Sequence, residues 1–316
     1  MRLSAGGEPA VEAPRSQIDG PQGPVALKVH RCRWSGDHPD NSLAAIGECL
    51  AVGVARAEFD LRMLCDADFA LLHDDAIRRP DGSGAAARTV SAADLLATPA
   101  GSRPALLSEA VSMLRDSPGA TVFEIDLKDD FEWPWRRVAE LREMLDPVRD
   151  RIVVAGCEDR TLRRLAKVAP EVQLGFNPAY HLDWVPEGAE GSLSPPRRAS
   201  GYLDAEADGP RSTTKAEHLR RRLAEVLALI PQARELHLRL LAFERMLDDG
   251  FAELAELVHG AGMLLDVWTL DAGTPDWRRR MARAVAAGAD MITTNTPARL
   301  AEAPQARRTD VRGRSP

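Results

Sequence analysis

The chain has 316 residues, enough for one α/β barrel of about 250 residues or for two smaller domains. Its net charge of −7 argues against a nucleic-acid-binding surface, which is normally basic, but is compatible with a local positive pocket for a phosphate. No run of the sequence approaches the roughly 18 apolar residues of a membrane span, so no stable membrane anchor is expected.

The two ends of the chain are expected to be unstructured. Residues 1–24 are rich in Gly, Pro, Glu and Ala, lack periodicity and have no apolar signal region, so we expect a disordered leader there and an equally disordered tail over residues 303–316. The four cysteines form neither a CxxC pair nor a disulfide framework, which favours free thiols in a reducing compartment. These features predict a cytoplasmic protein with one folded domain over residues 25–302.

Between these ends, short apolar strands alternate with helical patterns, as in a parallel sheet built from βα units. Several helical stretches begin at Asn, Ser, Asp or Thr and several end at Gly, which are typical cap residues. Eight strands are predicted, over residues 25–30, 56–61, 121–127, 151–156, 172–176, 235–240, 264–269 and 290–295. Eight βα repeats predict an α/β fold of the TIM (β/α)8 barrel type, whose active site is built at the carboxyl ends of the strands.

Three segments bear on the details of this barrel. A short extra strand, FALLHDD, and the Gly- and Ala-rich RRPDGSGAAARTVS that follows it predict a short excursion after the second strand. A single helix is predicted over residues 244–262. Residues 182–212 form a long irregular stretch, which we expect to be disordered or a mobile flap rather than a dedicated substrate-binding loop.

Polar side chains gather where the predicted strands end. Side chains two apart on a strand point to the same face, so the carboxylates of Glu58 and Asp60 project together and oppose each other electrostatically. Four pairs lie at such ends: His30 with Arg31, Glu58 with Asp60, His73 with Asp74, and Asp126 with Lys128. Because these ends meet at one mouth of a barrel, the four pairs favour one shared site over four unrelated surface positions.

Three carboxylates that face one another inside a barrel need counter-charge, because each buried ion loses several kcal/mol of hydration. Two remedies are open. The carboxylates either pair with Arg31, Lys128 and the histidines, or they hold a hard divalent cation. Oxygen ligands favour Mg²⁺ or Ca²⁺ over zinc, which prefers His and Cys.

Five motifs follow one another along the chain: HRCRWSGDHPDNSLAAI, EFDLRMLCDADFALLHDD, EIDLK, LLDVWTLD and AGADMITTNTPARL. Together they resemble the ordered signature of the glycerophosphodiester phosphodiesterases. In that family an H-R-G precedes a P-E-N-T-like helix start, and E-x-D, H-D, E-x-K, v-W-T and T-D-x-P segments follow. The likeness runs from about residue 25 to residue 300 and covers most of the chain.

The resemblance implies a TIM barrel that holds one divalent cation, Mg²⁺ or Ca²⁺, with Glu58, Asp60 and Asp126. It also implies that His30 and His73 are the catalytic acid/base pair. One would deprotonate the attacking oxygen and the other would protonate the leaving alkoxide, and the sequence leaves open which does which.

The resemblance further implies that Arg31 and Lys128 neutralise the phosphate oxygens of a small-molecule phosphodiester, and Trp268 is a candidate for the substrate pocket at the barrel mouth. The expected activity is hydrolysis of a glycerophosphodiester-like substrate to a phosphomonoester and an alcohol. Three alternatives stay open: a lyase similar to sphingomyelinase D that leaves a cyclic phosphate, a phosphodiesterase for a specialised sugar or metabolite diester, and an inactive barrel that only binds.

Three positions depart from the family's pattern. Cys32 replaces the Gly after H-R and brings a side chain near the site. Asp126 replaces the Glu of E-x-K and retracts that carboxylate by about one methylene, and Asn295 replaces an Asp after the last strand and removes a charge.

Four further residues carry weaker expectations. Glu124 lies one layer deeper than Asp126, either in a buried pair with Arg or Lys or behind the cation. Tyr180 and His181 begin the irregular stretch, where contact with the substrate is the less favoured alternative, whereas His237 is treated as an ordinary surface or core histidine.

Overall fold

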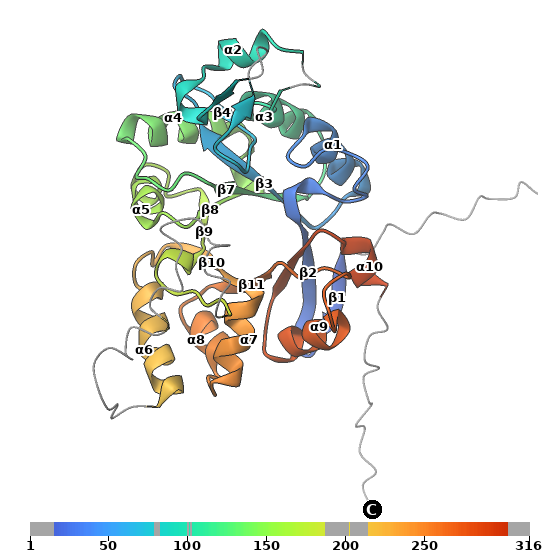
Figure 1. Ribbon diagram of the computed structural model, residues 1–316, viewed down its shortest axis with the longest axis vertical. Helices are drawn as coiled ribbons and strands as arrows, with labels where there is room; N and C mark the ends of the chain where they lie inside the picture. Colours follow the sequence, from blue (N-terminus) through green and yellow to red (C-terminus); the bar gives the residue numbers. More distant parts are fainter. Residues whose placement is uncertain are drawn as a thin grey trace, which may run out of the picture.

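The computed structural model describes residues 16–78, 83–99, 101, 103–186, 202 and 214–302, and within them a parallel sheet closes on itself (Figure 1). The strands follow the order β2-β12-β11-β10-β9-β8-β7-β3, and β3 pairs back with β2. In chain order they are β2 (Gly23–Val29), β3 (Arg56–Met63), β7 (Val122–Leu127), β8 (Ile152–Gly156), β9 (Gln173–Phe176), β10 (Ala233–Arg239), β11 (Leu264–Trp268) and β12 (Met291–Thr294). All eight predicted strands are present, and the TIM barrel is confirmed.

Helices surround the barrel (Figure 1). They are α1 (Leu43–Val52), α3 (Leu107–Asp116), α4 (Trp135–Leu145), α5 (Asp159–Val168), α6 (Lys215–Leu227), α7 (Leu240–Asp248), α8 (Leu254–Gly260), α9 (Trp277–Ala286) and α10 (Pro297–Ala301). The single helix predicted over residues 244–262 is wrong: it is divided between α7 and α8, with Gly250 between them at a φ of +91°. No helix in the described part of the chain is long and apolar enough to cross a membrane.

The predicted excursion lies between β3 and α3, at the top of Figure 1. It contains β4 (Phe69–Ala70), β5 (Ile77–Arg78), β6 (Gly84–Ala85) and α2 (Ala92–Leu96), and it has a small apolar cluster of its own. The extra strand is shorter than predicted, because only its first two residues pair with β3. His73 and Asp74 therefore lie in the loop that follows it.

The expected disordered leader is wrong in its last part. Gln17–Gly20 form β1, which pairs antiparallel with β2 and buries Ile18 against the barrel. A strand of four residues among Gly and Pro gives almost no periodic signal, which is why the sequence pattern misses it. Residues 1–15, the expected tail 303–316 and most of the irregular stretch (187–201 and 203–213) lie outside the described residues.

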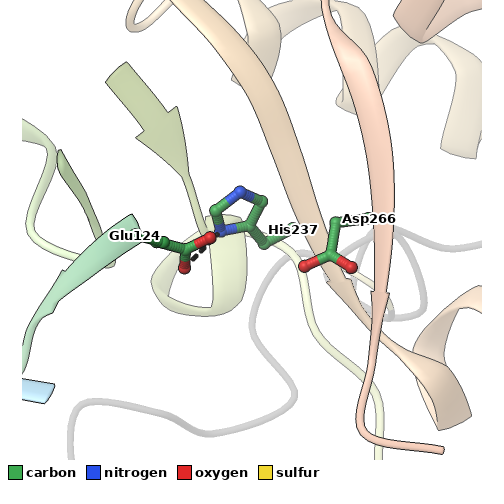
Figure 2. Close-up of side chains that lie close together, drawn as sticks. All are labelled: Glu124, His237 and Asp266. Carbon is green, nitrogen blue, oxygen red and sulfur yellow. Dashed lines mark ion pairs between the residues drawn. The ribbon is translucent and has the colours of Figure 1, made fainter. Parts of the chain in front are cut away.

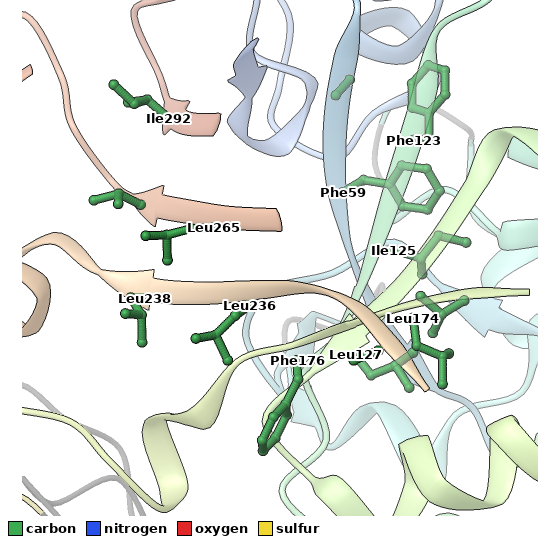
Figure 3. Packing of buried hydrophobic residues seen from close by; sticks show 14 of the residues in the cluster. Phe59, Phe123, Ile125, Leu127, Leu174, Phe176, Leu236, Leu238, Leu265 and Ile292 are labelled. Atoms are coloured by element: carbon green, nitrogen blue, oxygen red, sulfur yellow. The ribbon is translucent and has the colours of Figure 1, made fainter. Parts of the chain in front are cut away.

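The apolar core lies between the barrel and its helices, and Figure 3 shows part of it. On β7, Phe123, Ile125 and Leu127 are buried in this core, while Glu124 and Asp126 line a cavity within the barrel. The same alternation on β3 sends Phe59 to the core, since successive side chains of a strand point to opposite faces. The barrel interior can consequently be lined by polar and charged side chains.

Candidate active site

A cavity of about 190 Å³ lies at the carboxyl ends of the barrel strands. Its lining includes seven of the eight predicted site residues: His30, Arg31, Glu58, His73, Asp126, Lys128 and Trp268. The eighth, Asp60, is fully buried directly behind the cavity wall and is within ion-pair distance of Lys128. The chain fold thus brings all the predicted site residues to one place, including His73 from the excursion.

Glu58, Asp60 and Asp126 form an upper acidic cluster, in which each residue offers one oxygen and these atoms lie within 4.8 Å of one another. Strand register sets this arrangement, because Asp60 on β3 lies beside Asp126 on β7. Asn41 fixes Asp60: its Nδ2 donates to Asp60 Oδ2 over 2.8 Å, and the Asp60 backbone N–H donates to Asn41 Oδ1 over 3.0 Å. The shorter arm of Asp126 has not removed it from the cluster.

The chemistry of the upper cluster fits a hard divalent cation. Glu58 Oε1 is buried and has no hydrogen-bond partner among the described residues, which is costly for a carboxylate oxygen that no cation contacts. Burial, and then the neighbouring charge of Asp60, raises the pKa of Glu58 well above its usual value. All three side chains are carboxylates, the ligand type that Mg²⁺ and Ca²⁺ favour.

Two cationic side chains also reach the upper cluster. Lys128 Nζ contacts Asp126 and lies 2.9 Å from Asp60 Oδ1, while Arg31 Nε lies 3.2 Å from Asp60 Oδ2. Burial alone would lower the pKa of Lys128, but Asp126, Asp60 and Glu58 together raise it above its usual value. Pairing with cationic side chains and binding of a divalent cation, the two remedies that the sequence leaves open, are therefore compatible. Lys128 and Arg31 contact Asp60 and Asp126 and leave Glu58 Oε1 available.

His30 follows β2 and lines the cavity. Its Nδ1 lies 2.8 Å from Asn295 Oδ1, and its Nε2 lies 3.9 Å from Glu58 Oε2. Burial lowers the pKa of His30 below its usual value. Arg31 and Cys32 follow with φ angles of +52° and +56°, in the left-handed region that favours glycine. Cys32 does not line the cavity, because its Sγ points to the carbonyl oxygen of Glu58 at 3.4 Å.

His73 reaches the cavity from the excursion. Its Nδ1 lies 2.7 Å from Asp74 Oδ1, and its side chain is 41% exposed, far more than that of His30. The backbone carbonyl of His73 accepts a hydrogen bond from Arg62 Nε on β3 over 2.9 Å. This contact ties the loop to the strand that carries Glu58 and Asp60.

A lower ionic layer lies one residue pair deeper in the barrel, and three of its members converge from β7, β10 and β11 in Figure 2: Glu124, His237 and Asp266. Lys28 Nζ contacts Glu124 and lies 2.7 Å from Asp266 Oδ2. His237 Nδ1 lies 3.3 Å from Glu124 Oε1, and its Nε2 lies 3.1 Å from Glu235 Oε2. Glu124 is thus in a buried pair with a lysine, one of the two roles that the sequence allows.

The lower ionic layer already contains its cations. Burial would lower the pKa of His237, but Glu124 raises it above its usual value, and Asp266, Glu124 and Glu235 likewise raise the pKa of buried Lys28. Arg56 adds a further contact to Glu235. Glu124, His237 and Asp266 have metal-like spacing, and the ammonium of Lys28 already supplies a counter-charge to Glu124 and Asp266.

The cavity is also lined by five residues that were not predicted for the site: His237, which was expected to be an ordinary surface or core histidine, and Asp266, Asn177, Thr269 and Thr293. The signal for the first two was available, because polar residues alternate with apolar ones along ELHLR and LLDVW. Tyr180 and His181, for which contact with the substrate was the less favoured alternative, do not line the cavity, and His181 Nε2 lies 3.2 Å from Asp159 Oδ1.

Trp268 lies at the end of β11 on the cavity wall. The guanidinium of Arg239 stacks over its ring at 4.9 Å, and Arg239 is itself held by Asp183 at 3.1 Å. Trp268 Nε1 is buried and has no hydrogen-bond partner in the described part of the chain. A fixed ring with an unused donor is consistent with a position in a substrate pocket.

Gly175 on β9 makes room for the ring of His237. A Cβ atom at this position would lie 2.6 Å from His237 Cε1 and 2.9 Å from its Nε2. We expect Gly175→Ala to lower the free energy of unfolding by about 1–3 kcal/mol, because the ring is held on both nitrogens and cannot move aside freely. Urea unfolding measures this change. Gly84→Ala, where the added methyl meets nothing within 4 Å, is the control, and an equal change in both variants would contradict the packing argument.

The family model described as "Glycerophosphoryl diester phosphodiesterase family" matches residues 30–299. A search of curated protein sequences found no match.

Solved structures share the fold. A glycerophosphodiester phosphodiesterase from Parabacteroides distasonis has a TM-score of 0.58 and 14% identity, over 86% of this chain and 92% of that one. One from Thermotoga maritima has a TM-score of 0.54 and 18% identity, over 87% and 96%. An Oleispira antarctica phosphodiesterase, solved in complex with the product sn-glycerol-3-phosphate, has a TM-score of 0.54 and 14% identity, over 87% and 95%.

Proposed function

The chain belongs to the glycerophosphoryl diester phosphodiesterase family, and we propose that it hydrolyses a glycerophosphodiester-like substrate to a phosphomonoester and an alcohol, with the help of one divalent cation. The observation that carries this proposal is the upper acidic cluster at the cavity, whose three carboxylates lie beside the cationic Arg31 and Lys128 in a cavity that His30 and His73 also line. The Oleispira antarctica relative, solved with sn-glycerol-3-phosphate, supports a glycerol phosphate as the product here as well.

Glu58, Asp60 and Asp126 would hold the cation, which we propose to be Mg²⁺ or Ca²⁺. When bound, such an ion stabilises the negative charge that grows on phosphate oxygens in the transition state. Asn41 keeps the carboxylate of Asp60 in a fixed orientation for this purpose. A preorganised ligand does not have to be oriented at the moment of reaction.

Arg31 and Lys128 would bind the non-bridging oxygens of the phosphodiester. A phosphodiester monoanion repels nucleophiles, and cations beside it reduce this repulsion. Lys128 stays protonated because of its carboxylate neighbours, and its ammonium is at the cavity wall. Arg31 is held near the site through its backbone N–H, which donates to Glu58 Oε2 over 2.8 Å.

His30 and His73 would share the proton transfers. One accepts the proton of the attacking oxygen and the other gives a proton to the leaving alkoxide, a division that suits imidazoles near neutral pH. His30 lines the cavity from the segment after β2 and His73 lines it from the excursion, which supports a shared role of the two rings at one substrate.

The test is a panel of phosphodiesters with different head groups, incubated with and without chelator and followed by phosphorus NMR. We expect cation-dependent release of a phosphomonoester, with a glycerophosphodiester among the preferred substrates. A cyclic phosphate that persists would contradict hydrolysis and indicate a lyase similar to sphingomyelinase D. Turnover of only a sugar or metabolite diester would overturn the proposed substrate, and no turnover of any diester would overturn the enzyme assignment.

Glu58→Gln is expected to weaken binding of Mn²⁺, used as a spectroscopic probe, by more than about tenfold. A tenfold change needs only about 1.4 kcal/mol, which the loss of a buried charge from the ligand set exceeds. Electron paramagnetic resonance measures the affinity independently of activity. The control is Glu143→Gln on the exposed face of α4, and equal affinities in the two variants would remove Glu58 from the ligand set.

A further inference from the structure

Asp271, in the loop after β11, accepts hydrogen bonds from Asn295, the residue that contacts His30. Its Oδ1 accepts hydrogen bonds from the Asn295 backbone N–H over 2.6 Å and from Thr294 Oγ1 over 3.1 Å. Its Oδ2 accepts from Asn295 Nδ2 over 2.8 Å. Both carboxylate oxygens are therefore engaged, and both the backbone and the side chain of Asn295 are held.

The donors and acceptors in the hydrogen-bonded series Asp271–Asn295–His30 determine which end of the Asn295 amide faces His30. An ionised carboxylate only accepts hydrogen bonds, so the NH₂ group of Asn295 must face Asp271. The amide oxygen then faces His30 Nδ1 at 2.8 Å. Because that oxygen also only accepts, Nδ1 must carry the hydrogen. A neutral ring with its hydrogen on Nδ1 has a bare Nε2, the nitrogen that lies 3.9 Å from Glu58 Oε2.

We infer that Asp271 is a positioning residue that acts through Asn295 to hold neutral His30 in the Nδ1–H tautomer. His30 then presents at Nε2 a lone pair that accepts a proton from the attacking oxygen, and His73 is left to donate a proton to the leaving alkoxide. This inference rests on the proposed function, since it gives His30 one of the two roles described there.

The inference also explains the departure at Asn295. A carboxylate directly against His30 would fix the same tautomer, and the neutral amide alone would not, because an amide can turn either end toward the ring. Asp271 removes that freedom. The carboxylate that position 295 lacks is supplied by Asp271, which contacts the far side of the Asn295 amide. The orientation of the His30 ring is kept without a negative charge in direct contact with the ring.

The test uses the full chain with ¹⁵N-labelled histidine rings, at a pH where the imidazole is neutral, with the His30 signals assigned by their loss in His30→Gln. In the unmodified protein we expect Nδ1 of His30 to be protonated and Nε2 to be bare. Asp271→Asn frees the amide of Asn295 to turn, so we expect a substantial fraction of the Nε2–H tautomer. We also expect kcat to fall by at least about tenfold with little change in KM; a wrong tautomer costs about 10⁴-fold in the serine-protease triad.

The matched control is Asp276→Asn in the same loop, where the carboxylate is 69% exposed and contacts only Arg279 among the described residues. It is expected to leave both the tautomer and kcat unchanged. An Nε2–H ring in the unmodified protein overturns the inference even if Asp271→Asn fails to fold. An unchanged tautomer or an unchanged kcat in folded Asp271→Asn also overturns it. Full activity of His30→Gln would instead refute the proposed role of His30, while the NMR spectra still decide whether Asp271 sets the tautomer.

Discussion

Replacing Lys28 by methionine is expected to lower the free energy of unfolding by about 3–5 kcal/mol, because it leaves buried carboxylates without their partner. The side chain of Lys28 is 1% exposed, contacts Glu124 and lies 2.7 Å from Asp266. Both acids are buried in the barrel interior, so hydration replaces little of the lost contact with the ammonium. Urea unfolding at neutral pH measures the change directly.

Two further variants show whether charge is the cause. Lys215→Met removes a 45% exposed lysine that lies 3.3 Å from Asp249, and it is expected to cost less than about 1 kcal/mol. Adding Asp266→Asn to Lys28→Met is expected to recover part of the loss, because one of the unpaired charges is removed. If Lys28→Met were as stable as Lys215→Met, the lower ionic layer would have no role in holding the barrel.

His30→Gln is expected to lower kcat/KM for a glycerophosphodiester by about 10²- to 10⁴-fold, the usual contribution of a positioned acid or base. Glutamine keeps a polar side chain of similar length and removes the nitrogen that takes up a proton. Steady-state kinetics with saturating cation measure the loss. Thermal unfolding is expected to change little, because His30 is partly exposed and lies at the cavity wall.

The control for this variant is His38→Gln, in the exposed loop that follows His30. It changes the same residue type without touching the cavity, and unchanged kinetics are expected. A His30→Gln protein as active as His38→Gln would refute the acid/base role of His30 while leaving the barrel and its acidic cluster as described.

The strands were predictable because a barrel imposes a strict alternation on its sequence. On β3 and β7 the residues that face the helices are apolar, and the inward-facing ones include four acids, so two-residue spacing indicates which carboxylates converge: Glu58, Asp60, Glu124 and Asp126. The upper acidic cluster follows from that spacing together with the shared mouth of the barrel. The side on which His73 lies also follows, because the excursion leaves β3 at this mouth.

The remainder depended on contacts that carry no periodicity. Lys28 and Asp266 lie one and two residues before the ends of β2 and β11, so attention to the residues at and just after the strand ends does not find them. Asp271 and Asn295 are 24 residues apart in two loops, and their contact is set by how β11 and β12 end side by side. The break between α7 and α8 depends on one glycine, a residue that a helical pattern tolerates.

Charge balance in the lower ionic layer means that this part of the barrel does not need the ion that the upper acidic cluster is proposed to hold. Lys28, Arg56 and His237 face Glu124, Glu235 and Asp266. A cation above them adds stability only by mass action, about 2.7 kcal/mol at a hundredfold excess over its dissociation constant. Removal of the cation by a chelator is therefore expected to abolish activity without unfolding the protein. The protein is then expected to stay folded but inactive when free divalent cation is scarce. Activity is expected to recover when the cation is restored, without synthesis of new protein.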